Sequence, residues 1–577
     1  MSDFGVWAPL PGRVAVVLDG REHPMAPREQ GWWRASVPGA GSCPDYSFRL
    51  DGGDLLPDPR SAWQPAGAAG PSRVYDHGEF AWTDTGWRGV PLAGAVVYEL
   101  HIGTFTEAGT FDAAIGRLDH LVGLGVDAVE LMPVAAFPGR HGWGYDGIGL
   151  WAVHDPYGGP DGLKRLVDAC HARGLAVLLD VVYNHVGIGS RLADFGPYFT
   201  SAHDTPWGPA VNLDQAGSDE VRAFIIENAL MWLRDYHLDG LRLDAVHALA
   251  DDRALPLLEE LAGRVAALGV RLGRELVLIA ESDLNDPRLV TAREAGGYGL
   301  TAQWSDDFHH ALHAAVTGER QGYYADFGSL AALAQTLTRV FFHDGRWSSF
   351  RGRSHGRPVD RLRTPAWRFL GYLQDHDQIG NRAVGDRIAD LVPDGLLRVA
   401  AGLMLTAPFT PMLFMGEEWG ADTPWQYFTD HTDQDLARAV REGRRHEFAA
   451  HGWDAAQVPD PQDEQTFLRS KLDWSQPAGE PHRALLGWYA ELIALRRARP
   501  ELTDPRLEET TASWDEDARW LVLRRGELVI VASLSDVPLR VPLPLAPSSV
   551  LAASRPGVRA EGETAWMPGT SLAVLAR

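Results

Sequence analysis

A repeated alternation of short apolar strands and amphipathic helical stretches fills the middle of this 577-residue chain and constrains its fold more than any other feature. Apolar runs of about five to eight residues alternate with stretches of helical apolar spacing, a pattern typical of parallel β/α units. Eight strands are expected, at residues 96–100, 128–132, 176–182, 240–244, 276–280, 301–304, 369–373 and 411–415. Eight such units close into a (β/α)8 TIM barrel, so the sequence predicts an α/β protein with this barrel at its centre.

The connections between these strands carry further signals. Amphipathic helices are expected at residues 162–171 and 218–236, and Ser218 is expected to be the N-cap of the second, followed by two acidic residues in its first turn. Residues 346–364 are rich in Arg, Ser and Gly and lack periodicity. We expect them to form a long loop between strands six and seven, near the mouth of the barrel.

Both flanks of the barrel return to short strands separated by Gly- and Pro-rich turns, and 577 residues exceed what one core usually holds. Strands at residues 14–18, 32–37 and 45–50 predict an N-terminal β-sandwich, similar to carbohydrate-binding domains, over residues 1–88. Strands at residues 520–523, 528–532 and 539–543 predict a small C-terminal β domain over residues 501–577. The barrel is then expected to occupy residues 89–500.

Three of the predicted strands, the fourth, fifth and seventh, lead into carboxylates. Asp244 ends the stretch Gly-Leu-Arg-Leu-Asp, Glu281 follows Leu-Ile-Ala, and Asp377 lies in Leu-Gln-Asp-His-Asp-Gln. Catalytic groups of (β/α)8 enzymes lie at the carboxyl ends of the strands. Glycoside hydrolysis needs two carboxyl groups beside one bond, and a third can stabilise the cationic transition state. The three acids therefore predict a carbohydrate-active enzyme.

Composition excludes several other classes. The formal charge of −24 argues against nucleic-acid and anionic-membrane partners. The 21 Trp residues exceed core requirements and suit sugar rings, whose apolar faces pack on aromatic side chains. Cys43 and Cys170 have no metal-ligand spacing and are expected to be free thiols. The N-terminus lacks the pattern of an export signal and no apolar run approaches membrane-spanning length, so a soluble, cytoplasmic protein is expected.

The acidic stretches, together with Asp-Val-Val-Tyr-Asn-His at residues 180–185, resemble the characteristic regions of the α-amylase family of glycoside hydrolases, in the same order along the chain. Further segments resemble the members that release trehalose from maltooligosyltrehalose: Trp-Gly-Tyr-Asp-Gly at 143–147, Trp-Ser-Asp-Asp-Phe-His-His at 304–310, and Gly-Glu-Glu-Trp-Gly-Ala-Asp at 416–422. One departure is Asp375, where most of the family carry Asn.

The resemblance implies a role for each matching residue. Asp244 would be the nucleophile, Glu281 the general acid/base and Asp377 the stabiliser of the transition state. Arg242, on the same strand face as Asp244, would hold the nucleophile ionised. The remaining expected contacts are His185 and His376 as donors to hydroxyls of the glucose at the scissile bond, Tyr145 as a stacking partner beneath its ring, and His247 on the leaving-group side.

The expected reaction is hydrolysis, with retention, of the α-1,4 bond between a maltooligosyl chain and a terminal trehalose unit. It requires no cofactor, and no metal is expected at the acidic and histidine residues 306–310. Asp180 is interpreted as a buried structural carboxylate, and Glu417 and Glu418 as a hydrogen-bonding pair. The alternatives are a 1,4-α-glucan branching enzyme, a glycogen debranching enzyme and a non-catalytic amylase-like subunit.

Overall fold

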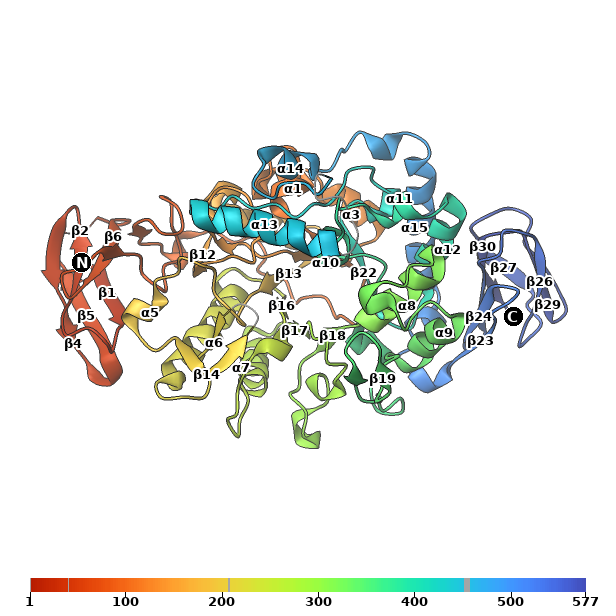
Figure 1. The fold of residues 1–577 in the computed structure, drawn as a ribbon, viewed down its shortest axis with the longest axis horizontal. Helices are drawn as coiled ribbons and strands as arrows, with labels where there is room; N and C mark the ends of the chain where they lie inside the picture. Colours follow the sequence, from red (N-terminus) through yellow and green to blue (C-terminus); the bar gives the residue numbers. More distant parts are fainter. Residues whose placement is uncertain (1, 40, 206–207, 451–456) are drawn as a thin grey trace.

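The computed structural model describes residues 2–39, 41–205, 208–450 and 457–577. At its centre, eight parallel strands form a closed barrel in the order β9, β10, β13, β16, β17, β18, β21 and β22 (Figure 1). Their bounds are Val97–Leu100, Ala128–Leu131, Ala176–Val181, Gly240–Leu243, Val277–Ala280, Ala302–Trp304, Phe369–Tyr372 and Thr410–Phe414. Each matches a predicted strand to within two residues at either end, so the predicted (β/α)8 barrel is confirmed.

The interior of the barrel is filled by side chains that alternate along the strands. The apolar members of this core include Val97, Ala128, Leu178, Ile279 and Met412, all buried. The opposite faces of the same strands pack against the surrounding helices, so each strand is buried on both sides, as expected of a parallel sheet.

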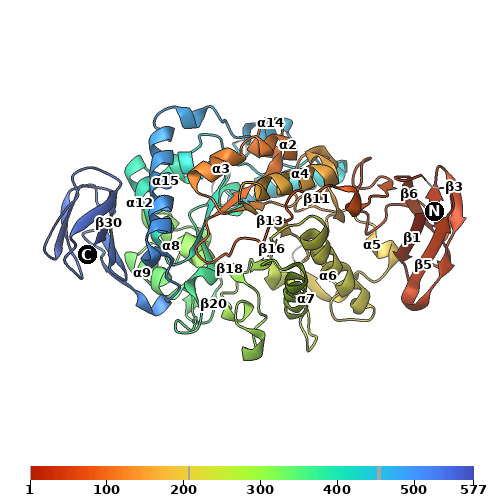
Figure 2. The same cartoon turned by 180° about the vertical axis from the view of Figure 1, so that it is seen from behind.

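Helices cover the outside of the barrel (Figure 2). Those of ten or more residues are α4 (Gly159–His171), α6 (Ser218–Asp235), α7 (Leu257–Leu272), α8 (Asp306–Thr317), α9 (Leu330–Arg339), α12 (Asp394–Thr406), α13 (Gln434–Ala450) and α15 (His482–Ala498). The shorter ones are α1 (Ile102–Phe105), α2 (Phe111–Ile115), α3 (Leu118–Leu124), α5 (Leu192–Phe195), α10 (His376–Gly380), α11 (Ile388–Leu391), α14 (Glu464–Arg469) and α16 (Pro500–Thr503).

The helix predicted at residues 218–236 forms, but its predicted cap is wrong. Ser218 is the first helical residue, and the N-cap is Gly217 in a left-handed conformation with φ 80°. The chain enters this helix through a tight turn against Pro197, where an added Cβ would lie 2.7 Å from the proline ring. Glycine alone adopts that conformation there without strain or a clash.

Two small antiparallel sheets form the N-terminal region at one end of the molecule (Figure 1). One contains β1 (Ser2–Trp7), β5 (Trp32–Val37) and β4 (Ala26–Pro27); the other contains β3 (Arg21–Pro24), β2 (Val14–Leu18), β6 (Asp45–Leu50), β7 (Leu55–Leu56) and β8 (Ser72–Arg73). The three strands predicted here appear with the expected bounds, and β1 and the shortest strands were not predicted.

Two further antiparallel sheets form the C-terminal region at the other end (Figure 1). The larger contains β23 (Thr510–Asp515), β24 (Trp520–Arg525), β25 (Leu528–Ser533), β30 (Ser571–Ala576) and β27 (Ser549–Ala553). The smaller contains β26 (Leu539–Pro542), β29 (Thr564–Met567) and β28 (Arg559–Glu561). Within the described part of the chain, no helix has the length and apolar character needed to span a membrane.

Candidate active site

The three predicted catalytic carboxylates lie at the same end of the barrel. Asp244 directly follows β16, Glu281 directly follows β17, and Asp377 lies in the short helix α10 beyond β21. The backbone N–H of Asp244 donates to Val181 and that of Glu281 donates to Leu243, so the strand ladder continues up to both acids. The barrel hydrogen bonds thus hold the two carboxylates side by side on adjacent strands.

Arg242 connects these acids. Its fully buried guanidinium lies over the ring of Trp304, 4.4 Å from the ring centroid, and its Nη1 donates to Asp244 Oδ1 at 2.7 Å. Its Nη2 lies 3.1 Å from Glu281 Oε2. A guanidinium pre-organised by an aromatic ring favours the charged form of any carboxyl that it contacts.

The two carboxylates have different surroundings. Asn184 donates a second hydrogen bond to Asp244 Oδ2 at 2.6 Å, so both oxygens of Asp244 accept from fixed donors. Burial raises the pKa of the Glu281 carboxyl well above its usual range, Arg242 opposes this shift, and the nearby carboxylates of Asp244 and Asp377 add to it. The site therefore pairs a carboxylate supplied with two donors and a carboxyl whose raised pKa favours the protonated form.

Ala245, which directly follows Asp244, supplies a backbone donor to the site. Its backbone N–H donates to Glu281 Oε2 at 2.6 Å. Ala245 itself has a left-handed conformation, with φ 38°, which is uncommon for alanine. The chain thus turns sharply just after Asp244 and aims a peptide group at Glu281.

His376 and Tyr145 are brought together beside Asp377. The two rings stack with centroids 5.2 Å apart, and His376 Nε2 lies 2.7 Å from Tyr145 Oη and 3.6 Å from Asp377 Oδ2. Tyr145 Oη donates to Asp180 Oδ2 at 2.6 Å. His376 Nδ1 contacts Glu99, which is buried at the end of β9. These groups form one continuous polar network.

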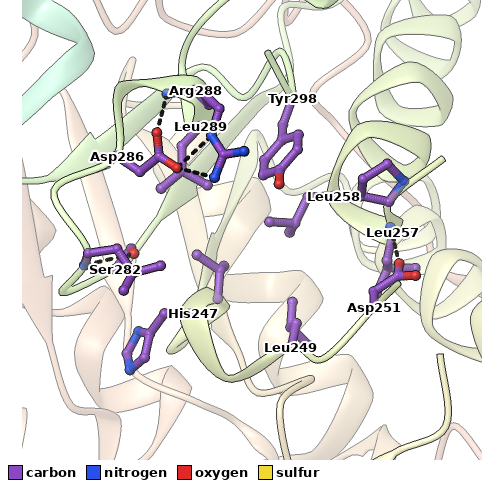
Figure 3. Close-up of a pocket in the computed structure, with 13 residues that line it drawn as sticks. His247, Leu249, Asp251, Leu257, Leu258, Ser282, Asp286, Arg288, Leu289 and Tyr298 are labelled. Atoms are coloured by element: carbon purple, nitrogen blue, oxygen red, sulfur yellow. Dashed lines mark hydrogen bonds and ion pairs between the residues drawn. The ribbon is translucent and has the colours of Figure 1, made fainter. Parts of the chain in front are cut away.

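The other two expected substrate contacts lie at the edges of this arrangement. His185 Nε2 lies 3.0 Å from the Tyr145 carbonyl oxygen, which places the imidazole next to the Tyr145 segment. His247 is not joined to Asp244 by a contact in the described structure; its Nε2 lies 4.0 Å from Asp283 Oδ1. Figure 3 shows His247 at one side of a pocket between the loops that follow β16 and β17, with Ser282 beside it.

Asp375 proves to be a structural carboxyl. It is buried, is the N-cap of α10, and accepts a hydrogen bond from the Gln378 backbone N–H at 2.7 Å. Burial raises its pKa well above the usual range, and the charged carboxylates near it reinforce the shift against the opposing effect of His376. Asp377 is 40 % exposed and open to a ligand. This contrast agrees with the choice of Asp377 over Asp375 as the third catalytic acid.

Several other acidic residues are engaged by protein partners. Asp180 is buried between Arg242 and Tyr145, and burial raises its pKa to about 6 despite Arg242. The other pairs are Asp306 with the Tyr372 hydroxyl, Asp307 with Asn285 and the backbone of residues 342 and 343, Glu417 with the Tyr489 hydroxyl, and Glu418 with His120 and the Tyr98 hydroxyl.

One cluster in the described residues has the composition of a cation site. His203, Asp214 and Asp252 offer atoms within 4.8 Å of one another. However, Asp214 Oδ2 already contacts His203 Nε2 at 2.9 Å and accepts from the Asp252 backbone N–H at 3.0 Å. The cluster satisfies its own hydrogen bonds, so we assign no metal to it.

Sequence reasoning missed three residues that complete the site: Glu99, Asn184 and Trp304. Asn184 falls within the stretch at 180–185, where only its neighbours were singled out. Glu99 and Trp304 lie on strands β9 and β18, facing the barrel interior. A signal for Glu99 did exist, because an acid inside a short apolar strand needs a partner when it is buried.

Comparison with known proteins agrees with the geometry. The catalytic domain of alpha amylase matches residues 82–195, and a domain of unknown function, DUF3459, matches residues 505–574. A malto-oligosyltrehalose trehalohydrolase from Arthrobacter ramosus is 58% identical over 93% of this chain and 94% of its own length. The chain belongs to the malto-oligosyltrehalose trehalohydrolase family. Another member of the family, from Rhizobium sp. strain M-11, is 51% identical over 99% of this chain and 97% of its own length.

A solved structure extends the agreement to three dimensions. A crystal structure from Salmonella typhimurium, provisionally described as an alpha amylase, superposes with a TM-score of 0.91 at 39% identity and covers 100% of this chain and 97% of its own. As a member of the malto-oligosyltrehalose trehalohydrolase family, the chain is a glycoside hydrolase with an α-amylase-type barrel.

Proposed function

We propose that the chain hydrolyses the α-1,4 bond between a maltooligosyl chain and a terminal trehalose unit, and releases trehalose and a shortened maltooligosaccharide. The observation that carries this proposal is the contact of one buried guanidinium, Arg242, with both Asp244 and Glu281 at the ends of adjacent strands. Two carboxyl groups held close to each other fit the retaining mechanism, in which one attacks and the other transfers the proton.

Glu281 is the general acid and then the general base. Its proton passes to the glycosidic oxygen as the bond to the anomeric carbon breaks, so trehalose leaves with a neutral hydroxyl. The raised pKa of its carboxyl supports this assignment, because the acid must hold its proton at the working pH.

Asp244 is the nucleophile. Hydrogen bonds from Arg242 and Asn184 keep its carboxylate oriented, and one oxygen forms the ester bond to the anomeric carbon. Water then gives a proton to the Glu281 carboxylate and attacks the same carbon, which returns Asp244 to its ionised form. Two inversions leave the α configuration unchanged.

Asp377 stabilises the positive charge that develops on the glucose ring and holds its hydroxyls. Tyr145 stacks beneath that ring, and His376 and His185, whose ring nitrogens contact protein groups, border the same part of the site. His247 faces the leaving-group side, where the pocket of Figure 3 lies beside it. The exposed fraction of Asp377 and its position next to the Tyr145–His376 stack support this arrangement.

The choice of substrate rests on the relatives. Proteins 58% and 51% identical over nearly the whole chain carry the name malto-oligosyltrehalose trehalohydrolase, and this favours trehalose release over glucan branching or debranching. A site built to hydrogen-bond the trehalose unit leaves polar groups unpaired when a plain glucan binds, which gives strong discrimination.

The test is a direct comparison of two substrates of five glucose units, maltotriosyltrehalose and maltopentaose. We expect kcat/KM to be at least about 10-fold higher for the first, a difference of about 1.4 kcal/mol in the barrier. The Glu281→Gln variant is the control for contaminating activity. Equal rates on the two substrates, or branched glucan as the main product from amylose, would refute the proposal.

The division at residues 88/89 and 500/501 is part of the same proposal, as is a cytoplasmic location. The location is supported by Cys43 and Cys170, which form no disulfide.

A further inference from the structure

The upper layer of the barrel interior is charged. Above the apolar positions, the next inward residues are Glu99 on β9, Glu130 on β10, Asp180 on β13 and Arg242 on β16, all buried. Glu99 and Glu130 are direct partners in the strand register. Arg242 and Asp180 pair with each other, so the partner of Glu99 must come from elsewhere.

That partner is His376. One carboxylate oxygen of Glu99 accepts from the His376 backbone N–H at 3.1 Å, and the other contacts His376 Nδ1. Both groups are buried, with side-chain exposures of 2% and 1%. Glu99 therefore fixes the first residue of α10 through its backbone and its ring at once.

From this ring a chain of contacts leads to the nucleophile. His376 Nε2 lies 2.7 Å from Tyr145 Oη, Tyr145 Oη lies 2.6 Å from Asp180 Oδ2, and Asp180 Oδ2 lies 2.7 Å from Arg242 Nη1. Arg242 Nη1 also donates to Asp244. Glu99 is the far end of this network, on β9, three strands away from the β16 strand that leads to Asp244.

The hydrogens available on each group determine which group donates in each hydrogen bond of the network. A tyrosine hydroxyl has one hydrogen, and that of Tyr145 is directed at Asp180. Tyr145 Oη must then accept from His376, which requires a hydrogen on Nε2. The contact with the Glu99 carboxylate requires another on Nδ1. Only the imidazolium carries both.

The electrostatics agree with this count. Burial alone would lower the pKa of His376, but Glu99 leads the carboxylates that reverse the effect and raise it to about 10. Burial also raises the pKa values of Glu130 and Asp375 well above their usual range, which favours their neutral forms. The ionisable groups that act on the ring from the surrounding elements are Glu99, His101, Glu130, Asp180, Asp375 and Asp377.

We propose that Glu99 is a positioning residue that keeps His376 an imidazolium, so that both ring N–H groups donate and the Tyr145 hydroxyl is directed at Asp180. The effect on catalysis rests on the proposed function, because it acts through the glucose-binding part of the site. The ring protonation does not depend on the reaction.

The first test is NMR of protein with histidine labelled at 13Cε1, titrated from about pH 6 to 9, with His376→Gln used to assign the signal. In the wild type the His376 signal should stay that of an imidazolium, and in Glu99→Gln it should titrate within this range. Glu130→Gln is the matched control: it removes a buried carboxyl from the neighbouring strand at the same height, and His376 should remain charged. A cationic His376 in Glu99→Gln would overturn the proposal.

The second test is kinetic. In Glu99→Gln, kcat should fall at least about 10-fold at pH 8, equivalent to 1.36 kcal/mol, with the alkaline limb of the pH profile moved to lower pH. Glu99→Asp keeps the charge and should retain the wild-type alkaline limb, whatever its kcat. If Glu99→Gln does not fold, the NMR titration of Glu99→Asp is the deciding measurement. A neutral His376 in Glu99→Asp at pH 7 would refute the proposal. The same shift of the alkaline limb to lower pH in Glu130→Gln would also refute it. Failure of the wild type to cleave maltotriosyltrehalose would refute the proposed function and leave the NMR result to decide the role of Glu99.

Discussion

Asp375→Asn should have little effect although the residue is two positions from a proposed catalytic acid. Asp375 is buried at the N-cap of α10, and its Oδ1 accepts from the Gln378 N–H at 2.7 Å. Its pKa is raised well above the usual range, chiefly by burial, and this favours the neutral carboxyl. Asn has the same shape, is neutral, and offers the same acceptor.

The expected change in the free energy of unfolding follows from the role of Asp375 as an N-cap. Asn and Asp are about equally good at an N-cap, so the loss in the free energy of unfolding should stay below about 1 kcal/mol. Asp375→Ala removes the acceptor and should cost about 1–2 kcal/mol. With the site geometry kept, kcat/KM of Asp375→Asn should remain within about threefold of the wild type, whereas Asp377→Asn should lose on the order of 100-fold or more, about 2.7 kcal/mol.

The pH dependence gives a second measure of the same substitution. Because the folded-state pKa of Asp375 lies above its unfolded value of about 3.9, its contribution to stability is full below that value and is lost as pH rises toward the folded pKa. Asn has no such loss. The stability of Asp375→Asn relative to the wild type should therefore increase as pH rises above about 4, by up to 1.36 kcal/mol per pH unit.

The assay combines chemical denaturation at several pH values with steady-state kinetics on maltotriosyltrehalose. Asp375→Asn, Asp375→Ala and Asp377→Asn form the series. If Asp375→Asn proved as damaging to kcat/KM as Asp377→Asn, the third catalytic acid would be misassigned. A relative stability that fell with rising pH would show that Asp375 is ionised in the folded protein.

Three further outcomes are expected. Asp244→Asn and Glu281→Gln should each lower kcat by several orders of magnitude, about 4 kcal/mol or more, with unchanged circular dichroism; a variant that keeps over a tenth of the wild-type rate would contradict its assignment. The rate should fall as pH rises through the raised pKa of Glu281, so the alkaline limb of kcat/KM should lie well above pH 4.5. Substrate binding by the Glu281→Gln variant should show no such decrease with pH. Proton NMR during the first minute should show the new reducing end as the α-anomer, and β-anomer first would exclude retention.

The barrel was predictable because its signal is local. Each barrel strand is a short apolar run bounded by turns, and eight such runs in β/α alternation leave few other folds. The carboxylates at the ends of β16 and β17 were predictable for the same reason, since Asp244 and Glu281 interrupt apolar runs. The segment predicted to be a loop at residues 346–364 contains a short antiparallel pair of strands, β19 (Trp347–Ser348) and β20 (Arg353–Ser354). It lies near the site, because its Arg351 pairs with Asp283, two residues beyond Glu281.

What could not be predicted depends on contacts distant in the sequence. Glu99 and His376 are 277 positions apart, and no local pattern indicates that they meet. The prediction of the α6 N-cap failed for a different reason. The packing of Gly217 against Pro197 overrides the preference of Ser218 for the N-cap position. Helix α13, in the long connection after β22, also went unpredicted: its strongly polar sequence resembles a solvated loop.

The left-handed backbone of Ala245 has a consequence for protein engineering. Left-handed alanines are standard targets for stabilisation, because glycine relieves a strain on the order of 1 kcal/mol. Here the residue with this torsion angle also donates its peptide N–H to the proton donor, and it directly follows the nucleophile. A screen that selects only for heat resistance would therefore find Ala245→Gly attractive, while the looser turn would reduce turnover. At this position, a substitution that makes the protein more stable would also make the enzyme slower.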